Sequence, residues 1–172
     1  MDSFFKSIGL YDTLDFETEM SKSELIINLK KLVYKSDFSI FEAADYSIPN
    51  RFEYKGFVNE NNFTLRRRKH FFDSKIPNSN IKGVVYEKNG KTFIKTEFIP
   101  VQYLIINLIL PVLIFSALSL LINESGLLFF SIAAITITTC NYYFTTKINI
   151  KRNKYDFERE LNFIAQKAIS TI

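Results

Sequence analysis

The sequence predicts an α+β fold: a small antiparallel sheet with one packed helix, followed by a two-helix transmembrane hairpin and a C-terminal amphipathic helix. Three observations lead to this prediction. Residues 1–100 mix strand-like and helix-like apolar patterns, residues 101–146 contain a single charge, and a helical apolar repeat returns after them. We therefore divide the 172 residues into a cytoplasmic domain (1–98), a hairpin (99–146) and a tail (147–172).

The composition indicates an ordered chain without a metal or cofactor. Hydrophobic residues make up 47%, with 18 Phe, which is enough apolar surface to form a core. A single Cys excludes a disulfide framework within the chain, and one His with one Cys leaves no Cys/His zinc set. No phosphate-binding glycine-rich loop or metalloprotease motif is present in the sequence, so no cofactor is expected.

Residues 22–34 are predicted to form the helix of the first domain. Ser21 and Glu24 fit a capping box, in which each side chain satisfies a backbone amide at the start of a helix. Leucine, isoleucine and valine residues then recur at helical spacing, so one face of this helix is expected to be buried.

After residue 37 the pattern changes to that of a sheet of four or five strands. A polar turn is expected at residues 59–62. Asn89-Gly90 lies between two alternating apolar runs, which is a strong hairpin signal. The candidate strands are residues 38–41, 51–58, 63–68, 81–88 and 91–98.

Residues 101–122 and 126–146 contain no charged side chain and are predicted to be membrane-spanning helices. Sixteen Lys and Arg residues precede residue 101, six follow residue 146, and none lies between them. The positive-inside rule then places both termini in the cytoplasm. We accordingly expect a multi-pass protein of a bacterial cytoplasmic (inner) membrane, with the bacterial source suggested only by the composition.

Two polar side chains are expected to meet inside this hairpin. Antiparallel pairing about residue 124 places Asn107 and Asn141 at equal depth, where their amides could form an interhelical polar pair. The alternative is that both amides lie near the headgroups and are hydrated. Cys140, in an apolar setting, is expected to be an inert packing residue.

The tail is predicted to be an amphipathic helix over residues 153–170. Docking on the domain, lying on a membrane and binding another chain are all open to it. Its polar face carries charges of both signs, whereas interfacial helices favour a basic face, so docking is preferred.

A run of basic residues in the domain has three interpretations. It could resist edge-to-edge association of an edge strand, contact anionic lipid headgroups, or bind nucleic acid. The domain has a net charge of only +2, so nucleic acid is not expected as a partner. The predicted headgroup contacts are Arg66, Arg67, Arg68, Lys69, Lys151 and Arg152.

No residue set in the sequence predicts catalysis. His70 is the only histidine, and the sequence offers no nucleophile elbow that would give it a partner. The favoured function is a non-catalytic binding or regulatory module whose partner is another membrane protein, membrane lipids or a second copy. The alternatives are a lipid or apolar-ligand binding module, a membrane-lipid-modifying enzyme and a toxin-immunity protein.

Overall fold

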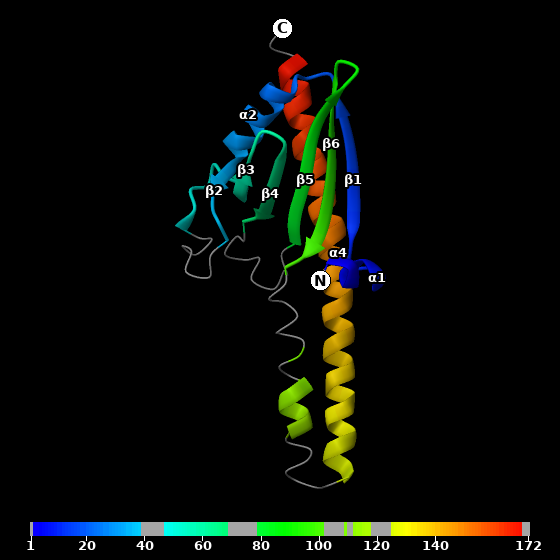
Figure 1. Ribbon diagram of the computed structural model, residues 1–172. Coiled ribbons are helices and arrows are strands. Elements are labelled where there is room, and N and C mark those ends of the chain that lie inside the picture. Colours follow the sequence, from blue (N-terminus) through cyan, green and yellow to red (C-terminus); the bar gives the residue numbers. More distant parts are fainter. Residues whose placement is uncertain are drawn as a thin grey trace.

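The computed structural model describes residues 2–38, 47–68, 79–101, 109, 112–117 and 125–169. Six strands form one sheet, and α2 and the C-terminal part of α4 lie behind it in the view of Figure 1. The labelled helices are α1 (Asp2–Ser7), α2 (Lys22–Leu32) and α4 (Ser125–Ile169), and residues 112–117 are also helical. The strands are β1 (Asp12–Thr18), β2 (Val33–Lys35), β3 (Tyr54–Val58), β4 (Asn62–Arg67), β5 (Ser79–Lys88) and β6 (Lys91–Pro100).

The sheet is larger than predicted, and it is mixed rather than purely antiparallel. Its strand order is β1-β6-β5-β4-β3-β2, and β2 pairs with β3 in parallel while the other pairs are antiparallel. The predicted sheet of four or five antiparallel strands is therefore wrong. Helix α2 connects β1 at one edge of the sheet to β2 at the other, and β2 therefore runs in the same direction as both β1 and its neighbour β3.

The predicted helix and hairpins are confirmed where local signals specify them. Ser21 caps α2 by accepting a hydrogen bond from the backbone amide of Glu24 at 3.4 Å. The β5–β6 hairpin turns at Asn89 and Gly90, whose φ angles of 54° and 75° suit a two-residue turn. The Asn59 amide donates to the Asn62 carbonyl at 2.8 Å and closes the predicted turn between β3 and β4.

Strands β1 and β2 were not predicted. Asp12, Asp15 and Glu17 make β1 unlike a strand in composition, yet it pairs with β6 along its full length. Val33 is the C-cap of α2 and the first residue of β2. Because Val33 also fits the helical spacing of the preceding apolar residues, the predicted helix over residues 22–34 ends too late. The predicted strand over residues 38–41 lies outside the described residues, except for Phe38.

Helix α4 replaces two separately predicted elements, the second membrane helix and the tail helix. In the described part of the chain, no helix combines the length and the apolarity that crossing a membrane requires. This corrects the predicted transmembrane hairpin and the predicted multi-pass inner-membrane location. The physical reason is that a run without charge can still contain polar residues: five Thr, two Tyr and one Asn interrupt the apolar residues of α4 between residues 125 and 146. Most of residues 101–122 lie outside the described residues.

The C-terminal half of α4 fills the inner face of the sheet, so docking on the domain, the favoured prediction for the tail, is confirmed. Ile150, Phe157, Leu161 and Ile164 belong to the same buried cluster as the sheet residues. Phe157 lies at its centre, with its ring 5.7 Å from those of Tyr54 and Phe63 and 6.2 Å from that of Phe98, measured between centroids.

Candidate functional site

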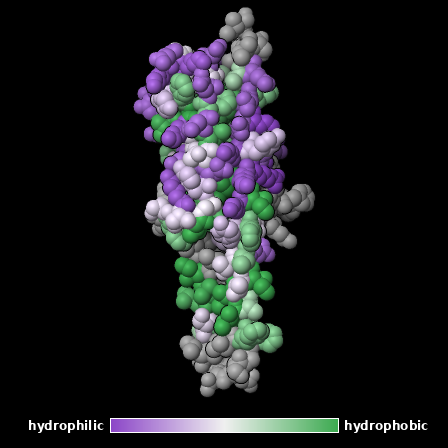
Figure 2. All heavy atoms as spheres, turned by 90° about the vertical axis from the view of Figure 1, so that its right-hand side faces the viewer, coloured by the Kyte–Doolittle hydropathy of each residue, from purple (hydrophilic) through white to green (hydrophobic). Residues whose placement is uncertain are grey.

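The candidate site is the N-terminal half of α4, which extends beyond the sheet (Figure 1). We call residues 129–146 the α4 shaft. It carries large apolar side chains that are mostly exposed: Phe129 by 73%, Phe130 by 74% and Ile137 by 68%. Figure 2 shows the contrast, with hydrophobic side chains gathered over the lower part of the molecule and hydrophilic ones over the sheet domain. Such exposure is unusual for a free surface and typical of a surface that contacts something else.

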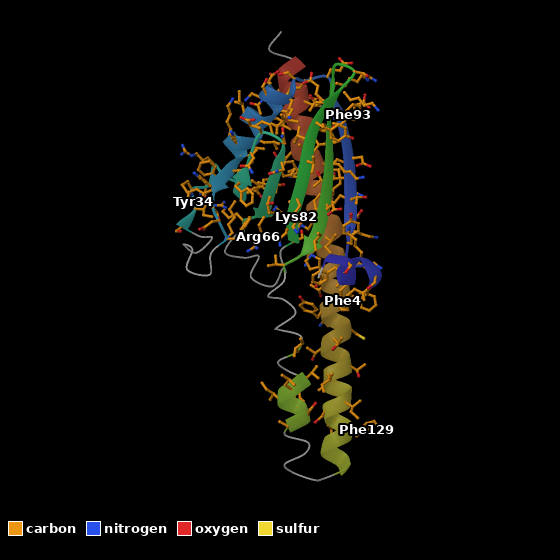
Figure 3. The ribbon with its side chains drawn as sticks, viewed as in Figure 1. Phe4, Tyr34, Arg66, Lys82, Phe93 and Phe129 are labelled. Atoms are coloured by element: carbon orange, nitrogen blue, oxygen red, sulfur yellow. The ribbon has the colours of Figure 1, made fainter. Side chains whose placement is uncertain are left out.

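The exposed apolar positions are not confined to one narrow stripe. Phe130, Ile137 and Phe144 recur every seven residues and therefore share one face. Phe129 and Ile132 point in other directions and are exposed by 73% and 56%. Figure 3 shows Phe129 toward the end of α4 that is farthest from the sheet.

Three hydroxyl groups of the shaft bond within the helix itself. The hydroxyl groups of Thr136 and Thr138 donate to backbone carbonyls four residues earlier, at 2.8 and 2.7 Å. Thr145 donates to the side-chain oxygen of Asn141 at 3.1 Å. These three hydroxyl groups therefore need no hydrogen bond from water.

The predicted interhelical pair of Asn107 and Asn141 stays a prediction. Asn141 is exposed and accepts from Thr145, whereas Asn107 lies outside the described residues. Cys140 is exposed, so the predicted packing role for this thiol is wrong.

At the base of the shaft, aromatic and basic side chains meet the sheet domain. The Tyr143 hydroxyl donates to the Ile8 carbonyl at 3.0 Å, and the Lys147 ammonium lies 5.7 Å from the centre of the Tyr143 ring. Phe4 of α1 is exposed by 54%, and Figure 3 shows it beside this part of α4. Lys151 is exposed one turn further along α4. We call Phe4, Tyr143, Lys147 and Lys151 the base of the shaft.

An ion pair between β4 and α4 holds the shaft on the domain. Arg67 donates to Asp156 at 2.6 Å and to Glu53 at 3.1 Å. Burial lowers the pKa of Arg67, but the hydrogen bond to Glu53 and the charge of Asp156 raise it above its usual value overall. Two further contacts align α4, from Lys154 to Asp12 at 2.8 Å and from Asn153 to Ser79 at 2.7 Å. The base of the shaft is therefore fixed relative to the sheet.

The residues of the predicted basic cluster, 66–70, do not form one surface where the structure describes them. Strand β4 lies between β3 and β5, so the interpretation of the cluster as an edge strand is wrong. Arg66 donates to Asn80 at 3.2 and 3.0 Å, and Arg68 is 5% exposed and donates to the Ile48 carbonyl at 2.7 Å. Lys69 and His70 lie outside the described residues. Lys151 and Arg152 are exposed beside the shaft, where headgroup contact stays a prediction.

Within the described ranges, no group of His, Cys, Asp and Glu side chains could hold a metal ion. Desolvation raises the pKa of the buried Tyr54 hydroxyl above its usual value, so this group stays neutral in the core. Glu17 forms an ion pair with Lys91, and Asp12 forms one with Lys154.

We expect the Arg67–Asp156 pair to stabilise the fold measurably. Replacing Arg67 with Met or Asp156 with Asn should each lower the free energy of unfolding by about 1–3 kcal/mol, because the remaining partner is left partly buried. A double-mutant cycle followed by urea unfolding should give a coupling of about 1 kcal/mol or more.

The control for this cycle uses the same carboxylate. Arg159 is 61% exposed and lies 4.0 Å from Asp156, so Arg159→Gln should cost less than about 0.5 kcal/mol. Equal losses from Arg67→Met and Arg159→Gln would show that the buried pair does not hold α4 in place.

No protein-family model matches this sequence, and no curated protein or solved structure matches it either. The geometry of the described residues is therefore the basis for a functional assignment.

Proposed function

We propose that this protein is a non-catalytic binding module, in which the sheet domain holds the α4 shaft in place and the shaft binds an apolar partner. The observation that carries the proposal is the exposure of Phe130, Ile137 and Phe144 on a helix whose C-terminal half packs one face into the core. A loose amphipathic segment could hide these side chains by folding back, but a helix fixed at the core cannot.

The attachment of α4 supports a presenting role for the domain. Phe157 packs against three aromatic rings, and Arg67 pairs with Asp156, the residue that precedes Phe157 in α4. Pre-organised surfaces bind with a smaller loss of conformational entropy than flexible ones. A shaft held in this way is suited to recognition rather than to closing over a substrate.

The charges of the sheet domain support a protein or lipid partner over nucleic acid. Lys6 pairs with Glu97 at 3.2 Å, and Lys91 pairs with Glu17. In both pairs a carboxylate neutralises the basic side chain, whereas nucleic-acid binding needs a continuous basic patch.

The proposal is tested by photo-crosslinking in cells. A photoreactive amino acid placed at Phe144 of the full chain should form adducts, whereas the same group at Tyr86 of β5 should not. Both side chains are exposed, by 60% and 44%, so the two positions are matched in accessibility. Adding Phe130→Ser and Ile137→Ser should reduce the adducts formed at position 144.

Two outcomes would contradict the proposal. If position 86 forms the adducts and position 144 forms none, the sheet and not the shaft is the binding surface. If neither position forms adducts, the exposed shaft has no partner in the cell and the proposal fails.

A further inference from the structure

We infer that the partner of the shaft is an anionic lipid surface, with the shaft among acyl chains and the base of the shaft at the headgroups. This inference rests on the proposed function and names its partner. It concerns contact with lipid, which requires no helix long enough to cross a bilayer.

The apolar side chains of the shaft suit acyl chains better than the face of another helix. A helix that binds one partner helix presents a narrow stripe, as in a coiled coil. Here the neighbouring residues Phe129 and Phe130 are exposed by 73% and 74% although they point about 100° apart around the helix. Lipid surrounds a helix and can cover such a wide surface.

Two exposed hydroxyl groups of the shaft already have hydrogen-bond acceptors that do not depend on water. Thr136 and Thr138 donate to backbone carbonyls of their own helix at 2.8 and 2.7 Å. In contact with acyl chains an unbonded hydroxyl would lose its hydrogen bonds to water, whereas these two lose nothing.

The base of the shaft provides charge complementarity. Lys147 and Lys151 are exposed where the apolar surface ends, and Tyr143 and Phe4 lie beside them. Aromatic and basic side chains favour the headgroup region of a bilayer, where each basic residue adds about 1 kcal/mol toward an anionic surface. From Gly126 to Thr146 the helix carries no charge, so the basic groups lie at one boundary only.

Vesicle flotation with the purified full chain tests this inference. The wild-type protein should float with vesicles of phosphatidylcholine and phosphatidylglycerol, and more weakly with phosphatidylcholine alone. Lys147→Gln with Lys151→Gln should weaken binding to the anionic vesicles about tenfold or more and leave binding to neutral vesicles unchanged. The matched control, Lys30→Gln with Lys88→Gln, removes two exposed charges elsewhere in the domain and should have no effect.

The shaft is tested with the natural thiol. Cys140 is exposed, so an environment-sensitive fluorophore can be attached there. Its emission should shift to shorter wavelength when anionic vesicles are added. The same fluorophore at Lys88→Cys, in a Cys140→Ser background, should show no shift. Phe130→Ser with Ile137→Ser should abolish flotation and leave the urea unfolding midpoint unchanged, because both side chains lie outside the core.

The outcomes separate this inference from the proposed function. Flotation that does not depend on phosphatidylglycerol, or a fluorophore that does not respond, overturns the anionic-lipid assignment. If the protein does not float, but shaft adducts with a protein persist in cells, the partner is a protein and only the lipid inference fails. A defined dimer that dissociates in the Phe130→Ser, Ile137→Ser variant would identify a second copy as the occupant.

Discussion

Replacing Phe157 with alanine is expected to lower the free energy of unfolding by about 3–5 kcal/mol. The side chain is 1% exposed, and its ring contacts those of Tyr54, Phe63 and Phe98. Alanine would leave a cavity between α4 and the sheet, and the fixed strands on the other side could not close it. Urea unfolding, with the slope compared between variants, measures this loss.

Phe163 is the matched control for this substitution. It lies on the same helix and is 62% exposed, so Phe163→Ala should cost less than about 0.5 kcal/mol. If Phe157→Ala cost no more than Phe163→Ala, then α4 would not be part of the folding core. The attachment of the shaft, and the function proposed for it, would then lose their basis.

Replacing Gly56 with alanine should destabilise the protein by a comparable amount, about 3–5 kcal/mol. Gly56 of β3 has a φ of 142°, and an added Cβ would lie 2.1 Å from the carbonyl oxygen of Thr64 on the paired strand. That oxygen belongs to the backbone, so relief requires the separation of β3 from β4. Thermal and urea unfolding of Gly56→Ala would report the cost.

Gly90 separates the steric part of this effect from the conformational part. Its φ is 75°, but no heavy atom lies within 4 Å of an added Cβ. Gly90→Ala should therefore cost only about 1–2 kcal/mol, for the left-handed backbone alone. Equal losses at Gly56 and Gly90 would mean that β3 and β4 do not approach as closely as described.

Local signals explain which parts of the fold were predictable. The β5–β6 hairpin depends on Asn89-Gly90, and α2 depends on its cap at Ser21, so neighbouring residues are sufficient for both. Strand β1 depends on distant residues instead. Its Asp12 and Glu17 are balanced by Lys154 and Lys91, which lie far away in the sequence, so the propensity of the segment alone pointed away from a strand.

The sequence predicted a helix where the shaft lies but assigned it to a membrane span. Residues 126–146 contain no charged side chain, but no helix of the described residues is long and apolar enough to cross a membrane. The Arg67 pair was missed, although a signal existed. Side chains alternate along a strand, so Arg67 shares the inner face of β4 with the buried Phe63 and Leu65 and requires a carboxylate there.

The unbroken course of α4 has a mechanical consequence. From residue 127 to residue 169 the helix contains neither glycine nor proline, which are the usual sites of a bend. When a sideways force acts near Phe129, the helix therefore tilts as a rigid rod. The pivot is the contact between Tyr143 and Ile8. The opposing load falls on the contacts of Phe157, so tilting the far end strains the interior of the sheet domain directly.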